Sequence, residues 1–377
     1  MAVTVLCGLA AAGCGESLRR DAPAFGPCYP QGPHTPRVQY LRSFSGGGDF
    51  RAPGGGFWQR LFGGSTEAAD GLVKPYGLAA AEAKLFVCDT TRGDIFTFDF
   101  AGRSFDRWEH PGQGLSKPIA VRVTASGDIQ VCDAGLGAVL SFTAEGELLG
   151  SVNLATLQET TPSASLPEAL RPVGLADGPA GTTAVLNAAA HRVELIDLRT
   201  GRHAGSWSGP GSEEGRLYYP TGMTQSNDGT LWIVDRMNRR VLGLGPGGQA
   251  VAGFGDAGDQ PGYLSQPRGV AVDEHGVIYV VDAGLPGIQL FDRTGEFLMG
   301  FGYPQDPGPA VTLPAGICLD RSALPYFADC VRPDFEAEYL IFVSDQSGPD
   351  RVHVYAFGRG TGSPANQPRT TVARRPG

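Results

Sequence analysis

Aspartate recurs at one place in a repeated pattern, directly after a run of apolar residues. The residues concerned are Asp89, Asp133, Asp235, Asp282 and Asp345. Carboxylates repeated in this way could ligate metal ions, or each could accept backbone N–H groups of the turn that follows its own strand. We expect the second role, because a repeated turn needs one such carboxylate in each repeat.

The other residues that carry chemistry form no familiar catalytic or metal-binding motif. Six histidines are present, and they fall at unequal places in the pattern: His191 in a loop, His275 in a hairpin turn and His353 inside a strand, for example. No G-x-S-x-G, P-loop or H-E-x-x-H sequence occurs. The absence of C-x-x-C and C-x-x-C-H argues against zinc-ribbon, thioredoxin-like and c-type haem sites. We therefore expect no catalytic residue, no metal ligand and no cofactor.

The seven cysteines suggest packing and cross-linking rather than catalysis. Cys88 and Cys132 occupy the same place in neighbouring repeats, where we expect small buried side chains. Cys318 and Cys330 flank the start of an insertion, and in an oxidising compartment we expect a disulfide between them. Pairing of Cys28 with one of these two is the alternative.

Proline marks the start of each repeat. The prolines are 43, 54, 48, 47 and 47 residues apart, and the stretch that follows reads, for example, "PTGMTQSNDGTLWIVD" or "PRGVAVDEHGVIYVVD". They are Pro75, Pro118, Pro172, Pro220, Pro267 and Pro314. Self-similarity at this period is typical of a propeller or a solenoid.

Each repeat predicts four short strands joined by turns that often contain glycine. The second strand is apolar at successive positions, as in "VIYVVD", so both of its faces must be buried. Sheets arranged face to face around an axis satisfy this requirement. We therefore predict an all-β fold, a six-bladed β-propeller of four-stranded antiparallel blades. The strand-like segment "RVQYLRSFSG" at 37–46 should complete the sixth blade and close the ring.

These repeats resemble the NHL repeat. The stretch "PTGMTQSNDGTLWIVDRMNRRVLGL" has Asp235, Asn238, Arg240 and Val241 in the places that the motif expects, and the resemblance covers roughly residues 37–360. The third repeat departs from it, with Asn187 in place of the aspartate. The resemblance implies a propeller that serves as a binding scaffold, and the alternative is a metal-dependent lyase or hydrolase with its site in the axial channel. Because a fold does not fix a function, both remain open at this point.

The N-terminus resembles a bacterial lipoprotein leader. The stretch "MAVTVLCGLAAAGCGES" is an apolar run that ends in small residues before Cys14, which would be lipidated. We expect a signal peptide at 1–13, a tether at 14–36, the propeller at 37–360 and a disordered tail at 361–377. The expected location is outside the cytoplasm, on a membrane that the protein contacts only through its lipid anchor.

Charge and surface residues indicate the class of partner. The net charge of −9 and the pI near 5.2 argue against nucleic acid. Blade starts and the loops between second and third strands should share one rim, and tyrosine and arginine are favoured at binding hot spots. We predict that a protein, peptide or glycan binds a monomeric propeller there. The rim residues are Tyr76, Arg92, Tyr218, Tyr219, Arg236, Asn238, Arg240 and Arg268.

Overall fold

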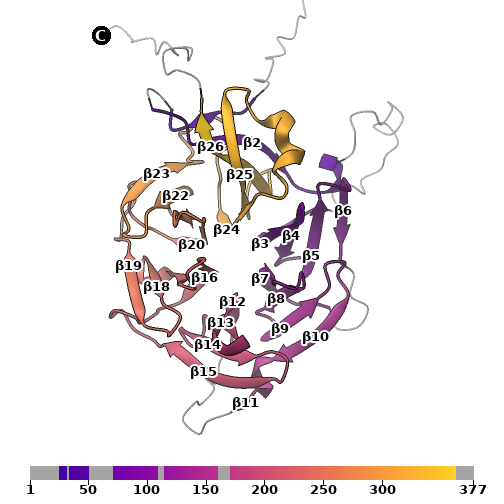
Figure 1. Ribbon diagram of the computed structural model, residues 1–377, viewed down its shortest axis with the longest axis vertical. Helices are drawn as coiled ribbons and strands as arrows, with labels where there is room; N and C mark the ends of the chain where they lie inside the picture. Colours follow the sequence, from indigo (N-terminus) through magenta and orange to yellow (C-terminus); the bar gives the residue numbers. More distant parts are fainter. Residues whose placement is uncertain (1–24, 32–33, 51–70, 109–113, 160–169, 362–377) are drawn as a thin grey trace, which may run out of the picture.

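Six sheets stand as blades around a central axis in the computed structural model (Figure 1). The structure describes residues 25–31, 34–50, 71–108, 114–159 and 170–361. Within these ranges regular structure is almost entirely strand, so the predicted six-bladed, all-β propeller is confirmed. None of the described helices has the length and apolar character needed to cross a membrane.

In the first five blades, four consecutive strands run from the axis outward and pair antiparallel. Blade 1 holds β3 (Pro75–Ala81), β4 (Lys84–Asp89), β5 (Asp94–Asp99) and β6 (Ser104–Arg107). Blade 2 holds β7 (Pro118–Val123), β8 (Ile129–Asp133), β9 (Ala138–Phe142) and β10 (Leu148–Asn153). Blade 3 holds β12 (Pro172–Asp177), β13 (Thr183–Asn187), β14 (Arg192–Asp197) and β15 (Arg202–Ser208), with the short β11 (Gln158–Glu159) parallel to β15. Blade 4 holds β16 (Pro220–Gln225), β17 (Leu231–Asp235), β18 (Arg240–Leu244) and β19 (Ala250–Phe254). Blade 5 holds β20 (Pro267–Val272), β21 (Ile278–Asp282), β22 (Gly287–Phe291) and β23 (Phe297–Phe301).

The sixth blade joins the two ends of the ring. Its inner strands are β24 (Pro314–Asp320), β25 (Phe335–Asp345) and β26 (Val352–Gly360), and β2 (Val38–Phe44) pairs antiparallel with β26. The predicted closure by the segment at 37–46 is confirmed. A fifth strand, β1 (Cys28–Tyr29), pairs with β2 and falls within the stretch 14–36, where only a tether was expected.

The glycine of the Pro-x-Gly motif allows the innermost strands to approach one another. A Cβ atom at Gly222 would lie 2.6 Å from the Arg268 carbonyl oxygen, and one at Gly269 would lie 2.6 Å from the Ala315 carbonyl oxygen. Neither separation is sterically possible, so only glycine fits where the backbones of adjacent blades pass this closely.

The second strand of a blade is buried by the blades on both sides of it. In β21, Ile278 and Val280 pack with Trp232 of blade 4. Tyr279 and Val281 of the same strand face the other way and pack in the cluster of blade 6. Alternation across the pleat therefore divides one apolar run between two inter-blade cores, as the sequence predicts.

Each recurrent aspartate joins two loops of its own blade. Asp282 is fully buried, and its carboxylate accepts backbone N–H bonds from Ser265 and Gln266, before β20, and from Gly284 and Leu285, after β21. The same arrangement recurs at Asp89, Asp133 and Asp345. The expectation that these carboxylates bind turns is confirmed for these residues.

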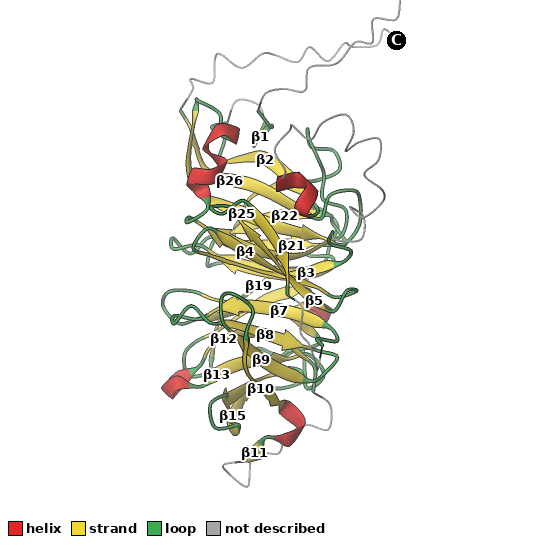
Figure 2. Cartoon of the chain, turned by 90° about the vertical axis from the view of Figure 1, so that its right-hand side faces the viewer, coloured by secondary structure: helices red, strands yellow, loops and turns green. Residues whose placement is uncertain are grey.

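Short 3-10 helices lie at the margins of the sheets (Figure 2). They are η1 (Gly47–Phe50), η2 (Leu154–Thr156), η3 (Pro179–Gly181), η4 (Arg236–Asn238) and η5 (Leu324–Cys330). The insertion whose start is flanked by Cys318 and Cys330 forms η5 and the start of β25 (Phe335–Asp345).

All five described cysteines are free thiols in the structure, and the strand order argues against the expected disulfide between Cys318 and Cys330, which stays a prediction. Cys318 lies on β24, whereas the carbonyl of Cys330 is bonded by Gln39 on β2. Two strands separate β24 from β2 in the sheet, which places these strands about 14 Å apart. Cys88 and Cys132 are fully buried, as predicted.

Candidate functional site: a cationic pocket at the propeller axis

A pocket opens at the end of the ring where the innermost strands begin. Its volume is about 250 Å³, and it leads into a narrower space of about 80 Å³ that is lined by the innermost strands of all six blades. We call the wider space the axial pocket. Its described lining is Lys74, Tyr76, Thr90, Lys117, Ile119, Arg171, Val173, Ala188, Tyr219, Pro220, Thr221, Arg236, Arg268 and Gln346.

Five cationic side chains from five blades line this pocket. Lys74, Lys117 and Arg171 each stand directly before the proline that begins an innermost strand. Arg268 follows the proline of β20, and Arg236 begins η4 after β17. Because the six blades are arranged around one axis, equivalent positions of successive repeats meet at its mouth.

These cations lack carboxylate partners among the described residues. None of the five forms an ion pair there, and the described lining contains no aspartate, glutamate or histidine. Within the described ranges, the Arg268 side chain donates to the side-chain oxygen of Gln346 at 2.9 Å, and that of Arg236 donates to the side-chain oxygen of Gln266 at 3.3 Å. The Nε of Arg236 is buried and finds no acceptor among the residues that the structure describes. Like charges grouped in this way repel one another, so the pocket is suited to an anion, although the chain carries a net charge of −9.

Four hydroxyl-bearing side chains accompany the cations in the described lining: Tyr76, Thr90, Tyr219 and Thr221. Burial raises the pKa of Tyr76, and the nearby Arg268, Arg236 and Arg171 oppose that rise because they favour the phenolate. With its pKa above the ordinary value, the Tyr76 phenol is neutral near pH 7 and can donate a hydrogen bond. The Thr221 hydroxyl is already bonded within the fold, because its Oγ1 donates to the Arg268 carbonyl at 2.9 Å.

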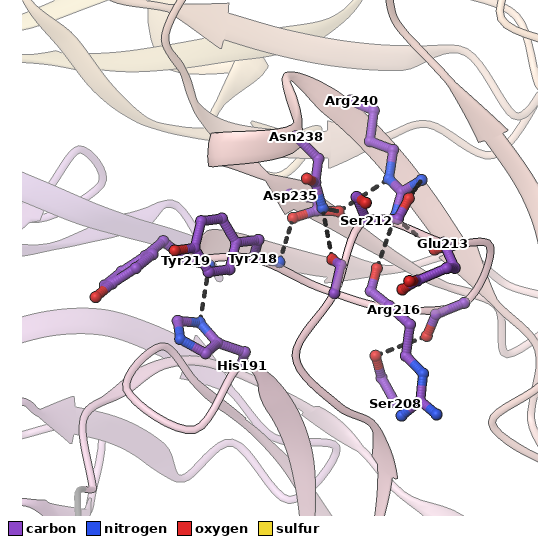
Figure 3. A network of polar contacts seen from close by, with 12 residues as sticks. His191, Ser208, Ser212, Glu213, Arg216, Tyr218, Tyr219, Asp235, Asn238 and Arg240 are labelled. Atoms are coloured by element: carbon purple, nitrogen blue, oxygen red, sulfur yellow. Dashed lines mark hydrogen bonds and ion pairs between the residues drawn. The ribbon is translucent and has the colours of Figure 1, made fainter.

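An aromatic cluster borders the pocket on one side. The rings of Tyr218, Tyr219 and His191 lie 4.5–5.2 Å apart, and both tyrosines are more than 40% exposed (Figure 3). The Tyr219 backbone N–H donates to Nδ1 of His191 at 2.9 Å. Both residues have positive φ angles, 52° for Tyr219 and 55° for His191, which non-glycine residues seldom adopt. Burial lowers the pKa of His191, and the charge of Asp235 opposes this.

The structure brings four of the eight predicted rim residues into the axial pocket. These are Tyr76, Tyr219, Arg236 and Arg268, and Tyr218 lies beside them in the aromatic cluster. Their role in binding stays a prediction.

The other three rim residues are held by the fold. Arg240 bonds the Asp235 carboxylate at 2.9 Å and the carbonyls of Ser212, Glu213 and Arg216 (Figure 3). Asn238 bonds the same carboxylate and the Gly211 carbonyl. Arg92 donates from Nε to the Gly71 carbonyl at 3.0 Å and does not belong to the described pocket lining. In blade 4, the side chains of Asn238 and Arg240 take the place of the two turn N–H groups that bond the aspartate in blades 1, 2 and 5.

Sequence reasoning missed Lys74, Lys117 and Arg171. Their signal lies in the register of the repeat: the residue before the blade-start proline is cationic in three consecutive blades. Aligning the repeats on their prolines and inspecting the residue before each proline, as well as the residue after it, would have found them.

Comparison with known proteins supports the fold. No family model and no curated protein matches the chain. Among solved structures, a candidate gluconolactonase has a TM-score of 0.54 at 11% identity, covering 90% of this chain and 96% of that one. A streptogramin B lyase has a TM-score of 0.51 at 14% identity, covering 76% and 94%. An inactive virginiamycin B lyase from Staphylococcus aureus, solved with quinupristin, has a TM-score of 0.50 at 16% identity, covering 75% and 95%. At these identities the likeness establishes a shared six-bladed propeller.

Proposed function

We propose that the protein is a binding scaffold outside the cytoplasm, whose axial pocket receives an anionic group of a protein, peptide or glycan ligand. One observation carries the proposal: five cations from five blades line one pocket whose described residues include no carboxylate. An anionic group would offset the repulsion among the cations, and the Tyr76 hydroxyl would donate a hydrogen bond that orients it. A volume of about 250 Å³ admits a side chain or terminal group rather than a folded partner, which would rest on the rim.

The test uses isothermal titration calorimetry with citrate, inorganic pyrophosphate, an oligoglutamate peptide and an oligouronate as probes. The variant carries Lys74→Glu, Lys117→Glu and Arg171→Glu together. Each of these residues joins the fold through its backbone N–H, bonded to Asp89, Asp133 or Asn187, while its side chain is exposed. The variant should therefore fold normally and lose anion binding. Failure of all four probes to bind the parent protein, or equal binding by the variant, would refute the proposal.

The alternative was a metal-dependent lyase or hydrolase acting in the axial channel. Such an enzyme needs a general base or metal ligands near its substrate. The described pocket residues supply cations, hydroxyls and one amide. In the part of the chain that the structure covers, no three His, Cys, Asp or Glu side chains are grouped to hold a metal ion. The geometry therefore favours binding as the proposal to test first.

The proposed location rests on the leader sequence. Cys14, the predicted lipidation site, lies outside the described residues. Anchoring through this residue would hold the propeller close to a membrane by its N-terminal side, and the first described strand, β1, begins only at Cys28.

A further inference from the structure

Cys28 stands where the N-terminus joins the last blade. It pairs with Gln39 across β1 and β2, and the Tyr40 N–H donates to the Pro27 carbonyl at 2.9 Å beside that pair. This pattern makes Cys28 and Gln39 a non-hydrogen-bonded pair, in which the two side chains lie on one face about 4.5–5.5 Å apart at Cβ.

The side chain of Gln39 brings the end of η5 to the same place. Gln39 is fully buried; its Nε2 donates to the Cys330 carbonyl at 3.0 Å, and its Oε1 accepts the Arg332 N–H at 3.0 Å. Cys28 and Cys330 also pack against the same hydrophobic cluster. The two cysteines, which are 302 residues apart in the sequence, are therefore both immediate neighbours of one glutamine.

Cys318 packs against that cluster too, but it lies on β24, at the opposite edge of the sheet from β1. The register places Gln39 opposite Ala356, Ala356 opposite Leu340, and Leu340 opposite Asp320. Cys318 thus lies on the third strand from Gln39 and two residues along, well beyond the Cα separation of about 7 Å that a disulfide tolerates.

We propose that Cys28 and Cys330 are a redox pair, whose disulfide locks the propeller ring by tying β1 to η5. One thiol, as its thiolate, attacks a small-molecule disulfide such as oxidised glutathione and releases one reduced half. The second thiolate then displaces the other half, so that two protons leave and two electrons pass to the oxidant. The bond encloses almost the whole propeller in one covalent loop.

The surroundings of the two thiols bear on when the bond forms. Burial raises the pKa of Cys28 to about 11; the charge of Arg332 lowers it and that of Asp334 raises it. Burial also raises the pKa of Cys330. Few thiolates are present in the closed ring, so exchange is slow there. The attack on the oxidant is therefore faster while β1 is undocked, and docking on β2 then brings the second thiol to the mixed disulfide.

The test is peptide mapping of the full chain after refolding with reduced and oxidised glutathione. Trypsin places Cys28, Cys318 and Cys330 on separate peptides, because Arg37 and Arg321 separate them. We expect the peptides of Cys28 and Cys330 to be linked, with the loss of the mass of two hydrogen atoms. Cys28→Ser and Cys330→Ser should each abolish the link, and the matched control Cys318→Ser should retain it.

A second measurement is thermal unfolding. Oxidation should raise Tm on the order of 5 °C in the parent protein and in Cys318→Ser, and should leave the other two variants unchanged. If Cys28 and Cys330 stay open to alkylation in the refolded, oxidised protein, or if either links to Cys318 instead, the proposal is wrong. Because neither cysteine belongs to the axial pocket, this outcome is independent of anion binding.

Discussion

Reversing the charge of Lys117 is the sharpest single test of the axial pocket. The side chain is exposed at the pocket, has no ion-pair partner among the described residues, and joins the fold only through its backbone. At a separation of about 7 Å and an effective dielectric constant of about 40, each unit charge contributes ~1 kcal/mol to the binding of a monovalent anion. Reversal changes the charge by two units, so Lys117→Glu should weaken binding by ~2 kcal/mol, or roughly 30-fold in Kd.

The chain offers a matched control for this change. Its lysines are Lys74, Lys84 and Lys117, and Lys84 lies at the start of β4, whose other end, Asp89, anchors the pocket loop. The length of β4 puts Lys84 about 17 Å from that end, roughly two Debye lengths at physiological salt. Lys84→Glu changes the net charge equally, from −9 to −11, and should alter Kd less than about 2-fold.

The assay is calorimetric titration of both variants with citrate at two salt concentrations; because citrate carries more than one negative charge, the roughly 30-fold loss is a lower bound. We expect Lys117→Glu to lose much of its affinity for citrate, with a smaller loss at higher salt, and Lys84→Glu to lose almost none. Equal losses in both variants would mean that the net charge of the protein, not a local site, governs the affinity. An unchanged Kd in Lys117→Glu would show that Lys117 does not contribute to anion binding.

Three other predictions concern the fold, the rim and the anchor. Asp282→Ala leaves four backbone N–H groups without their acceptor and should lower the free energy of unfolding, measured in urea, by about 3–5 kcal/mol. Asp282→Asn should cost less, because Asn187 fills the equivalent place in blade 3. Equal losses in the two variants would contradict this expectation. The pKa of His191 is lower in the folded chain than the ordinary value of 6.5, so its contribution to stability is complete above that pH and is lost as pH falls; His191→Ala should flatten the dependence measured between pH 7.5 and 5. Labelled palmitate should enter the chain in a bacterial host and be lost in Cys14→Ala, and a label that persists would place the lipid elsewhere.

Much of this protein follows from its sequence. The spacing of the six prolines and the runs that are apolar on both faces require stacked blades, because an isolated sheet could not bury a strand such as Ile278–Asp282 on both sides. The strand at Val38–Phe44 was recognisable as the missing fourth strand of the last blade. The role of the aspartates followed as well, because a hydrogen-bonded turn is a local property that repeats with the sequence.

Only the tertiary structure decided which residues meet. Arg236 and Arg240 look alike in "DRMNRR", yet the first enters the axial pocket and the second is bonded to Asp235 and to three carbonyls. Closure of the ring gathers Lys74, Lys117 and Arg171 around one axis from repeats that are 43 and 54 residues apart. The same closure sets both Cys28 and Cys330 next to Gln39 and leaves Cys318 three strands away from that residue, although Cys318 is far closer to Cys330 in the chain. Proximity around a closed ring depends on strand order and register, and the sequence distance between two residues does not contain that information.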